Sequence, residues 1–122
     1  MLTFNEYQKA TRKTALYRQT VDLKSHSGAE PFDVHWVYPA LKLSGEASEI
    51  AEKLGKILRD SGGVVDEKAT QQLKKELGDV LWYVAALADD FGLDMDDVAQ
   101  SNLDKLMSRF ERGKIQGSGD DR

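Results

Sequence analysis

Apolar residues recur at helical spacing through the segment LKKELGDVLWYVAALADDF, residues 73–91. On a wheel of about 100° per residue, most of its apolar side chains fall in one sector roughly 120° wide. A second stripe of this kind runs over residues 43–58. The chain has only two prolines, and it has no cysteine, which excludes disulfides and thiolate metal sites. These patterns predict an all-α fold, an antiparallel bundle of about four to five helices.

Capping residues place the ends of the expected helices. Thr3 and Glu6 form a capping box, and Asp66 and Asp94 are N-cap candidates. Gly92 is placed to end the helix that contains the strongest stripe. We therefore expect helices over about residues 3–20, 39–59, 66–91 and 95–111.

The rest of the chain lacks a clear period. Residues 22–34 hold Ser, Gly, Asp and Pro, which is typical of a loop. A further helical segment at 33–38 is a candidate to precede the second helix. We expect a single domain over residues 1–112. The Gly-rich polar tail, residues 113–122, is expected to be flexible, or ordered only against a partner.

The charge and hydropathy patterns exclude several classes of partner. The net charge is −4 and there is no long basic stripe, which argues against binding to a nucleic acid polymer. No apolar run approaches the roughly 18 residues of a membrane helix. The start of the chain is mixed polar and not a signal peptide, so we expect a cytoplasmic protein.

Two acidic pairs occupy equivalent positions on the two long helices. Glu46 and Glu49 lie one turn apart beside the first apolar stripe, and Glu76 and Asp79 lie one turn apart beside the second. If the helices pack through these stripes, four carboxylates converge, and they repel one another unless cations lie between them. An all-oxygen set of this kind suits Mg²⁺ or Mn²⁺.

Cations and aromatic residues accompany the acidic pairs. Lys53 and Lys56 share the strip that carries Glu46 and Glu49, and a second polar strip lies on the last helix. Such strips are either solvated faces or sites for the phosphates of a triphosphate. Trp82 and Tyr83 are candidate contacts to a nucleobase, although packing is their commoner role. The second strip consists of Asn102, Lys105, Arg109 and Arg112.

Plainer interpretations remain open for these residues. Glu49 with Lys53 is also the spacing of an ordinary surface ion pair. Di-iron bundles use a Glu-x-x-His pair, whereas His26 and His35 both precede the acidic helices and are better explained as loop residues. The residues alone are therefore compatible with a metal-dependent enzyme or with a solvated helical module.

Three segments together resemble the MazG-type all-α nucleoside triphosphate pyrophosphohydrolases, in a short single-domain form. They are GEASEIAEKLGK, KKELGDVLWYVAALADDFGL and NLDKLMSR. The resemblance implies a helical bundle completed by homo-oligomerisation, as a homodimer or homotetramer. It also implies that Mg²⁺ is bound by Glu46, Glu49, Glu76 and Asp79, and that the phosphates are met by Asn102, Lys105 and Arg109, with Lys53 and Lys56 as further candidates.

The reaction implied by the resemblance is hydrolysis of an NTP or dNTP to the monophosphate and pyrophosphate. A water activated by the metal would attack the α-phosphoryl group. We assign Glu49 as the carboxylate that orients or deprotonates this water. The alternative is a non-catalytic helical module that senses nucleotides or binds another protein.

Overall fold

The structure is a computed structural model that describes residues 1–20 and 35–122. This part of the chain is helical and contains no strand, which confirms the all-α prediction for these residues. None of its helices is both long enough and apolar enough to cross a bilayer. The helices are α1 (Phe4–Thr11), the 3₁₀ turn η1 (Arg12–Thr14), α2 (Tyr17–Thr20), α3 (Val37–Asp60), α4 (Glu67–Asp90) and α5 (Met95–Glu111).

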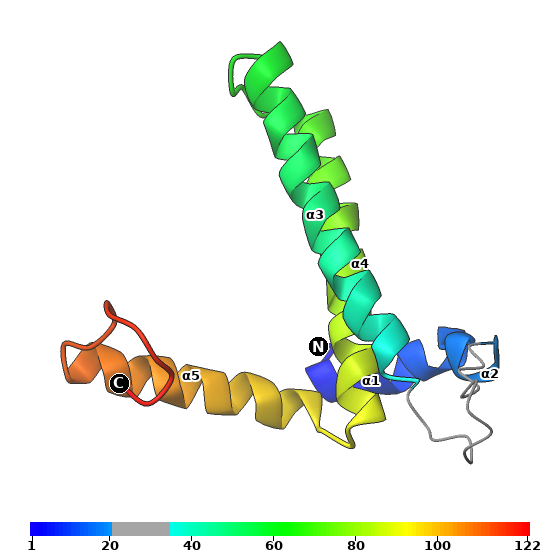
Figure 1. The fold of residues 1–122 in the computed structure, drawn as a ribbon, viewed down its shortest axis with the longest axis vertical. Coiled ribbons are helices and arrows are strands. Elements are labelled where there is room, and N and C mark those ends of the chain that lie inside the picture. Colours follow the sequence, from blue (N-terminus) through cyan, green and yellow to red (C-terminus); the bar gives the residue numbers. More distant parts are fainter. Residues whose placement is uncertain (21–34) are drawn as a thin grey trace, which may run out of the picture.

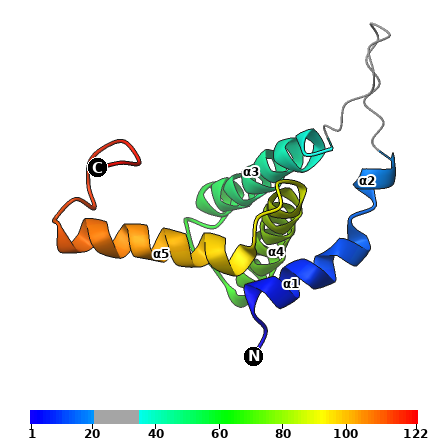
Figure 2. The same cartoon turned by 90° about the horizontal axis from the view of Figure 1, so that it is seen from below.

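The two long helices form the centre of the molecule. α3 and α4 run antiparallel and pack along their length as a hairpin (Figure 1). α1 packs against the C-terminal half of α4 and against the start of α5. α5 then projects away from the hairpin as an arm (Figure 2). The described residues of one chain therefore do not close into a compact bundle.

The predicted caps are present, and α1, α4 and α5 begin directly after them, as predicted. Thr3 and Glu6 form a reciprocal capping box at α1. The side chain of Asp66 accepts from the backbone N–H of Ala69, and Asp94 caps α5 in the same way. Gly92, with φ of 65°, follows the end of α4 in a left-handed conformation that favours glycine.

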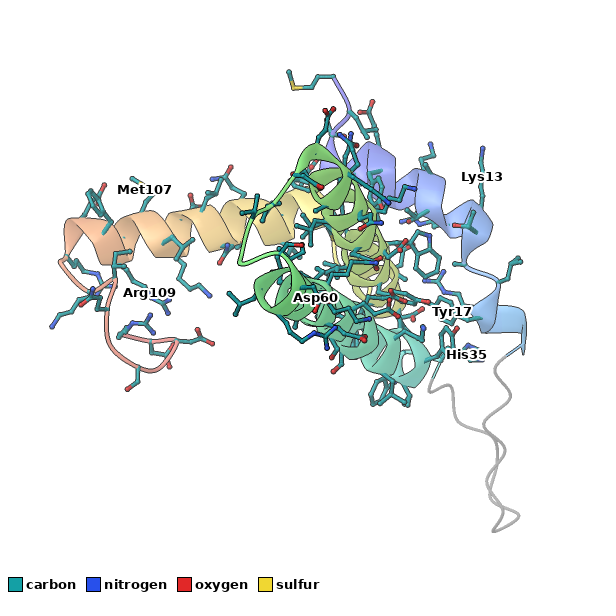
Figure 3. All side chains as sticks on the ribbon, turned by 90° about the horizontal axis from the view of Figure 1, so that it is seen from above. Lys13, Tyr17, His35, Asp60, Met107 and Arg109 are labelled. Carbon is teal, nitrogen blue, oxygen red and sulfur yellow. The ribbon has the colours of Figure 1, made fainter. Side chains whose placement is uncertain are left out.

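The prediction of one continuous helix over residues 3–20 is wrong. α1 ends at Thr11, tightens into η1, and is interrupted at Ala15, whose φ and ψ are −79° and 58°. Thr11 and Thr14 each donate their hydroxyl to the carbonyl oxygen three residues earlier, at 2.9 Å. Such local hydrogen bonds compete with the helical pattern. The break turns Tyr17 toward the end of the hairpin, as Figure 3 shows.

α3 starts two residues earlier than expected, at Val37, and Pro39 lies in its first turn. A proline is tolerated there because the N–H groups of a first turn have no partner within the helix. The predicted loop at residues 22–34 and His26 lie outside the described residues.

The buried core is small and lies where α1, η1, α2 and α4 meet. Ala85, Ala86 and Ala88 are its most buried apolar residues on α4. Long apolar side chains elsewhere on the predicted stripes remain exposed, because no described element covers them. They include Leu54, Leu58, Leu77, Leu103, Leu106 and Phe110.

Gln8 joins three segments at this junction. It is 3 % exposed, and its Nε2 donates to Asp89 Oδ1 at 2.9 Å and to the carbonyl oxygen of Leu93 at 2.8 Å. Its Oε1 accepts from the backbone N–H of Met95. Arg12 adds two hydrogen bonds to Asp89, from Nε and Nη2, each 2.8 Å. These contacts fix the direction in which α5 leaves the hairpin.

Candidate functional site

Three of the four predicted carboxylates meet on the α3–α4 hairpin. Glu46 of α3 and Glu76 and Asp79 of α4 each place one carboxylate oxygen within 4.8 Å of the others. The side chains of Glu46 and Glu76 are 15 % exposed, whereas Asp79 is exposed. Three hard oxygen donors in a partly buried group fit a divalent cation such as Mg²⁺. We call these three residues the acidic group.

Glu49 does not join the acidic group. It lies one turn after Glu46 on α3 and is exposed. Antiparallel packing of α3 on α4 brings Glu46 opposite Glu76 and Asp79 and leaves the fourth carboxylate outside. Glu49, the carboxylate predicted to activate water, therefore lies apart from the three oxygens of the acidic group.

Two lysines of α3 pair with the acidic group. Lys42 Nζ lies 3.3 Å from Glu46 Oε1, and Lys53 Nζ lies 3.2 Å from Glu76 Oε1 across the hairpin. Lys56 is different, because its Nζ lies 2.8 Å from Glu52, an exposed glutamate outside the group. The two lysines that share one strip in the sequence therefore have different partners.

A pocket of about 580 Å³ adjoins the acidic group. Glu46 and Asp79 belong to its wall, so the carboxylates and the pocket form one continuous hollow. The opposite wall comes from the segment around the break after α1. Among the described residues, the lining consists of Thr14, Leu16, Tyr17, Tyr38, Glu46, Asp79, Trp82 and Tyr83.

The aromatic residues of the pocket hold one another in place. The rings of Tyr17 and Tyr38 stack with centroids 5.4 Å apart, and Trp82 and Tyr83 meet edge to face at 4.9 Å. Trp82 Nε1 donates to Thr14 Oγ1 at 2.8 Å. Trp82 and Tyr83, the two predicted base contacts, thus both line the pocket, and each also packs against other aromatic rings.

Two tyrosine hydroxyls in the pocket stay protonated at neutral pH. Burial, followed by a hydrogen bond with Tyr38 and the nearby carboxylates, raises the pKa of Tyr83 to about 12. Burial and the hydrogen bond to Asp90 also raise the pKa of Tyr17. Tyr17 donates its hydroxyl to Asp90 Oδ2 at 2.6 Å, and Arg18 Nε donates to the other oxygen at 2.8 Å. Asp90 therefore anchors the pocket wall formed by α2.

The predicted phosphate-binding strip of α5 lies away from this hollow in the same chain. Asn102 and Lys105 are exposed along the arm, which makes no extensive contact with α3. Arg109 is 5 % exposed because the C-terminal tail covers it. Figure 3 shows Arg109 on the side of α5 that faces this tail.

In the structure the C-terminal tail folds back onto its own α5. Arg109 Nη2 donates to the carbonyl oxygen of Asp120 at 2.5 Å, and Arg112 Nη2 donates to that of Arg122 at 2.8 Å. Lys105 and Arg109 together lower the pKa of the Asp120 carboxyl. Arg109 Nε is buried with no hydrogen-bond partner among the described residues. Arg109 and Arg112 thus both donate hydrogen bonds to backbone carbonyl oxygens of the tail.

The sequence pattern described as the MazG nucleotide pyrophosphohydrolase domain matches residues 39–113, which include all four predicted carboxylates. The chain belongs to this MazG family. The match begins at Pro39 and ends just after α5, so it covers the hairpin and the arm but not α1 and α2.

Curated relatives extend the similarity over the N-terminal segment. The MazG chain is 47 % identical to the Gene 37 protein of Mycobacterium phage L5 over 116 residues, which cover 95 % of this chain and 96 % of that protein. It is 34 % identical to the protein YvdC of Bacillus subtilis (strain 168) over 74 residues, which cover 57 % of this chain and 70 % of that protein. No solved structure matches the chain significantly.

Sequence reasoning missed several residues that line the hollow or pair with the acidic group. Tyr38, Lys42 and Glu46 follow one another at intervals of four residues, which places them on one face of α3. That spacing was the available signal for Tyr38 and Lys42. Tyr17 and Thr14 had no comparable signal, because the break after α1 brings them to the pocket.

Proposed function

We propose that the chain is a Mg²⁺-dependent nucleoside triphosphate pyrophosphohydrolase, with Mn²⁺ as an alternative metal. It converts an NTP or dNTP to the monophosphate and pyrophosphate. The observation that carries this proposal is the shared hollow, in which Glu46 and Asp79 of the acidic group also line an aromatic pocket. Membership of the MazG family supports the same class of reaction.

Glu46, Glu76 and Asp79 would hold the divalent cation through carboxylate oxygens. When bound, the cation would neutralise phosphate charge and lower the pKa of a water molecule. In the net reaction, the water oxygen bonds to the α-phosphorus, and the bond from that phosphorus to the bridging oxygen of the β-phosphate breaks. Pyrophosphate leaves with that oxygen.

Glu49 is proposed to orient the attacking water or accept its proton. Its exposed position one turn after Glu46 leaves its carboxylate free of ion pairs with the other described residues. Lys53, the partner expected at i+4, instead pairs with Glu76. A carboxylate without a fixed cation is a better base than one neutralised by a neighbour.

The aromatic pocket is proposed to hold the nucleobase. Trp82 and Tyr83 on α4 line the pocket together with Tyr17 and Tyr38, so a flat ring could pack against an aromatic surface. Tyr17 already donates its hydroxyl to Asp90, so the protonated hydroxyl of Tyr83 is the proposed polar contact beside the base. The carboxylates adjoin this pocket, so the phosphates of a nucleotide bound there would extend toward the proposed metal.

A second copy of the chain is proposed to complete the bundle, as a homodimer or as part of a homotetramer. The hairpin exposes Leu54, Leu58 and Leu77, and the arm exposes Leu103 and Phe110. Apolar faces of this extent are uncommon on a monomer, and mutual burial would cover them.

Such an assembly would also allow α5 of one copy to approach the hollow of another. Asn102 and Lys105 are exposed and could meet phosphates directly. Arg109 could do so only after the tail moves, because tail carbonyls now accept its hydrogen bonds. Lys56, whose partner Glu52 is exposed, is a further phosphate candidate at the surface.

The experiment is product analysis across a panel of NTPs and dNTPs, with and without Mg²⁺. We expect equal amounts of monophosphate and pyrophosphate, formed only when the metal is present. Release of diphosphate and orthophosphate would contradict the proposed site of attack. Nucleotide binding without any turnover would favour the alternative of a non-catalytic sensing or interaction module.

A further inference from the structure

The acidic group carries two cations of its own. Lys42 reaches Glu46 within α3, and Lys53 reaches Glu76 across the hairpin, so two of the three carboxylates each have a lysine partner. Close carboxylates with little exposure repel one another, and each ammonium group offsets part of that repulsion. Lysine is suited to a temporary pairing, because its charge sits on a long flexible stem.

The paired oxygens belong to the proposed metal ligands. An ammonium group and a divalent cation therefore compete for the same two carboxylates. The side chains of Lys42 and Lys53 are 43 % and 33 % exposed, so both ammonium groups can turn into solvent without leaving a buried charge. Lys42 Nζ also lies 5.9 Å from the ring centroid of Tyr83, which places it at the border between the acidic group and the pocket.

We propose that Lys42 and Lys53 are exchangeable counter-ions of the acidic group. They neutralise Glu46 and Glu76 while no metal is bound, and they become phosphate contacts once a divalent cation takes over these carboxylates. This inference rests on the proposed function, and it assigns a substrate role to Lys42, which sequence reasoning missed. It also predicts that the metal strengthens binding of the phosphates partly by releasing two lysines toward them.

The test measures two ligands on the same variants. Lys42→Met and Lys53→Met are compared with Lys74→Met, which removes an exposed lysine of α4 that has no ion pair with the other described residues. Calorimetric titration with Mn²⁺ alone gives the affinity for the metal. Titration with inorganic tripolyphosphate at saturating Mn²⁺ gives the affinity for a phosphate chain without any contribution from a base.

The expected result is a pair of changes with opposite signs. Removing Lys42 or Lys53 tightens Mn²⁺ binding roughly three- to tenfold, because a competitor is lost, and weakens tripolyphosphate binding by a similar factor. Lys74→Met changes each affinity by less than about twofold. Unchanged tripolyphosphate affinity in both variants would overturn the inference, since the lysines would then be structural counter-ions only. Weaker Mn²⁺ binding would overturn it as well.

Two further measurements keep the test decisive. Lys42→Gln and Lys53→Gln remove the charge while keeping a polar end, and circular dichroism confirms that each variant is folded before titration. The titrations require no turnover, so they test the lysines independently of the reaction. The proposed function fails separately, if the wild-type protein binds Mn²⁺ and tripolyphosphate but releases no pyrophosphate from nucleotides.

Discussion

Lys53 Nζ lies 3.2 Å from Glu76 Oε1, and this ion pair joins the middle of α3 to the middle of α4. The spacing of Glu49 and Lys53 allowed an ordinary surface pair on one helix. The pairing across the hairpin instead connects the strip on α3 to the acidic group, and it leaves Glu49 without that cation. This contact therefore supports the proposed division of roles, in which Glu76 binds the metal and Glu49 acts on the water.

Glu76→Gln is expected to abolish stabilisation by the metal. A ligand that binds only the folded state at about 100 times its Kd adds about 2.7 kcal/mol, or roughly 10 °C in Tm for a chain of this size. Removing one of three carboxylates should eliminate most of that shift. Thermal melts with and without Mg²⁺ measure it, and Glu52→Gln, an exposed residue outside the acidic group, serves as the control. A full shift in Glu76→Gln would remove Glu76 from the metal site.

Glu49→Gln is expected to separate chemistry from metal binding. If Glu49 orients or deprotonates water, kcat should fall about 10²- to 10⁴-fold, whereas the shift in Tm produced by Mg²⁺ should persist. Steady-state kinetics and melts on the same preparation measure both quantities. Loss of the metal-dependent shift together with kcat would instead identify Glu49 as a metal ligand.

Asp89→Ala is expected to loosen the junction of α1, α4 and α5. The side chain of Asp89 is 7 % exposed and accepts hydrogen bonds from Arg12 and Gln8. Removing a charged acceptor of this kind should lower the free energy of unfolding by about 2 kcal/mol. Urea denaturation measures the change. Asp60→Ala breaks only an exposed pair with Arg59 and should lower the free energy of unfolding far less. Equal losses in the two variants would contradict the proposed importance of the junction.

Asp94 makes the stability of α5 dependent on pH. The backbone N–H of Asp97 and the side-chain amide of Asn5 donate to its carboxylate and lower its pKa below the ordinary value of 3.8. A lowered pKa in the folded state means that the stabilisation is present above pH 3.8 and is lost as the pH falls through the folded value.

Asp94→Asn should therefore be less stable than the wild type at pH 7, and the difference should shrink as the pH falls below 3.8. Urea melts at a series of pH values measure this difference. Asp121→Asn is the control, because this tail carboxylate has no hydrogen bond or ion pair with the other described residues. A difference that is constant with pH would show that ionisation of Asp94 does not contribute to stability, and it would contradict this prediction.

Local signals predicted where α1, α4 and α5 begin, but not the break that follows α1. Thr3, Asp66 and Asp94 cap helices through hydrogen bonds that span three residues, so their roles can be recognised in sequence. The break near Ala15 depends on threonine hydroxyls that were equally compatible with a continuous helix. Its consequence, Tyr17 in the pocket wall, could not be anticipated.

Only part of the candidate site could likewise be predicted from the sequence. Helical periodicity placed Glu46, Glu76 and Asp79 beside the stripes through which α3 and α4 pack, so their convergence followed from the pattern. The direction of α5 did not follow, because it is set by Gln8 and Asp89 acting between segments distant in sequence. The predicted strip on α5 was therefore found apart from the carboxylates of its own chain.

The central claim is that the acidic group is the catalytic metal centre, and pyrophosphate release by Asp79→Asn tests it most directly. With a nucleotide that the wild type hydrolyses in saturating Mg²⁺, Asp79→Asn should release pyrophosphate at least about 100-fold more slowly, a loss of about 2.7 kcal/mol of transition-state stabilisation. Glu52→Gln should stay within about twofold of the wild type. Pyrophosphate release by Asp79→Asn at the wild-type rate would contradict the account.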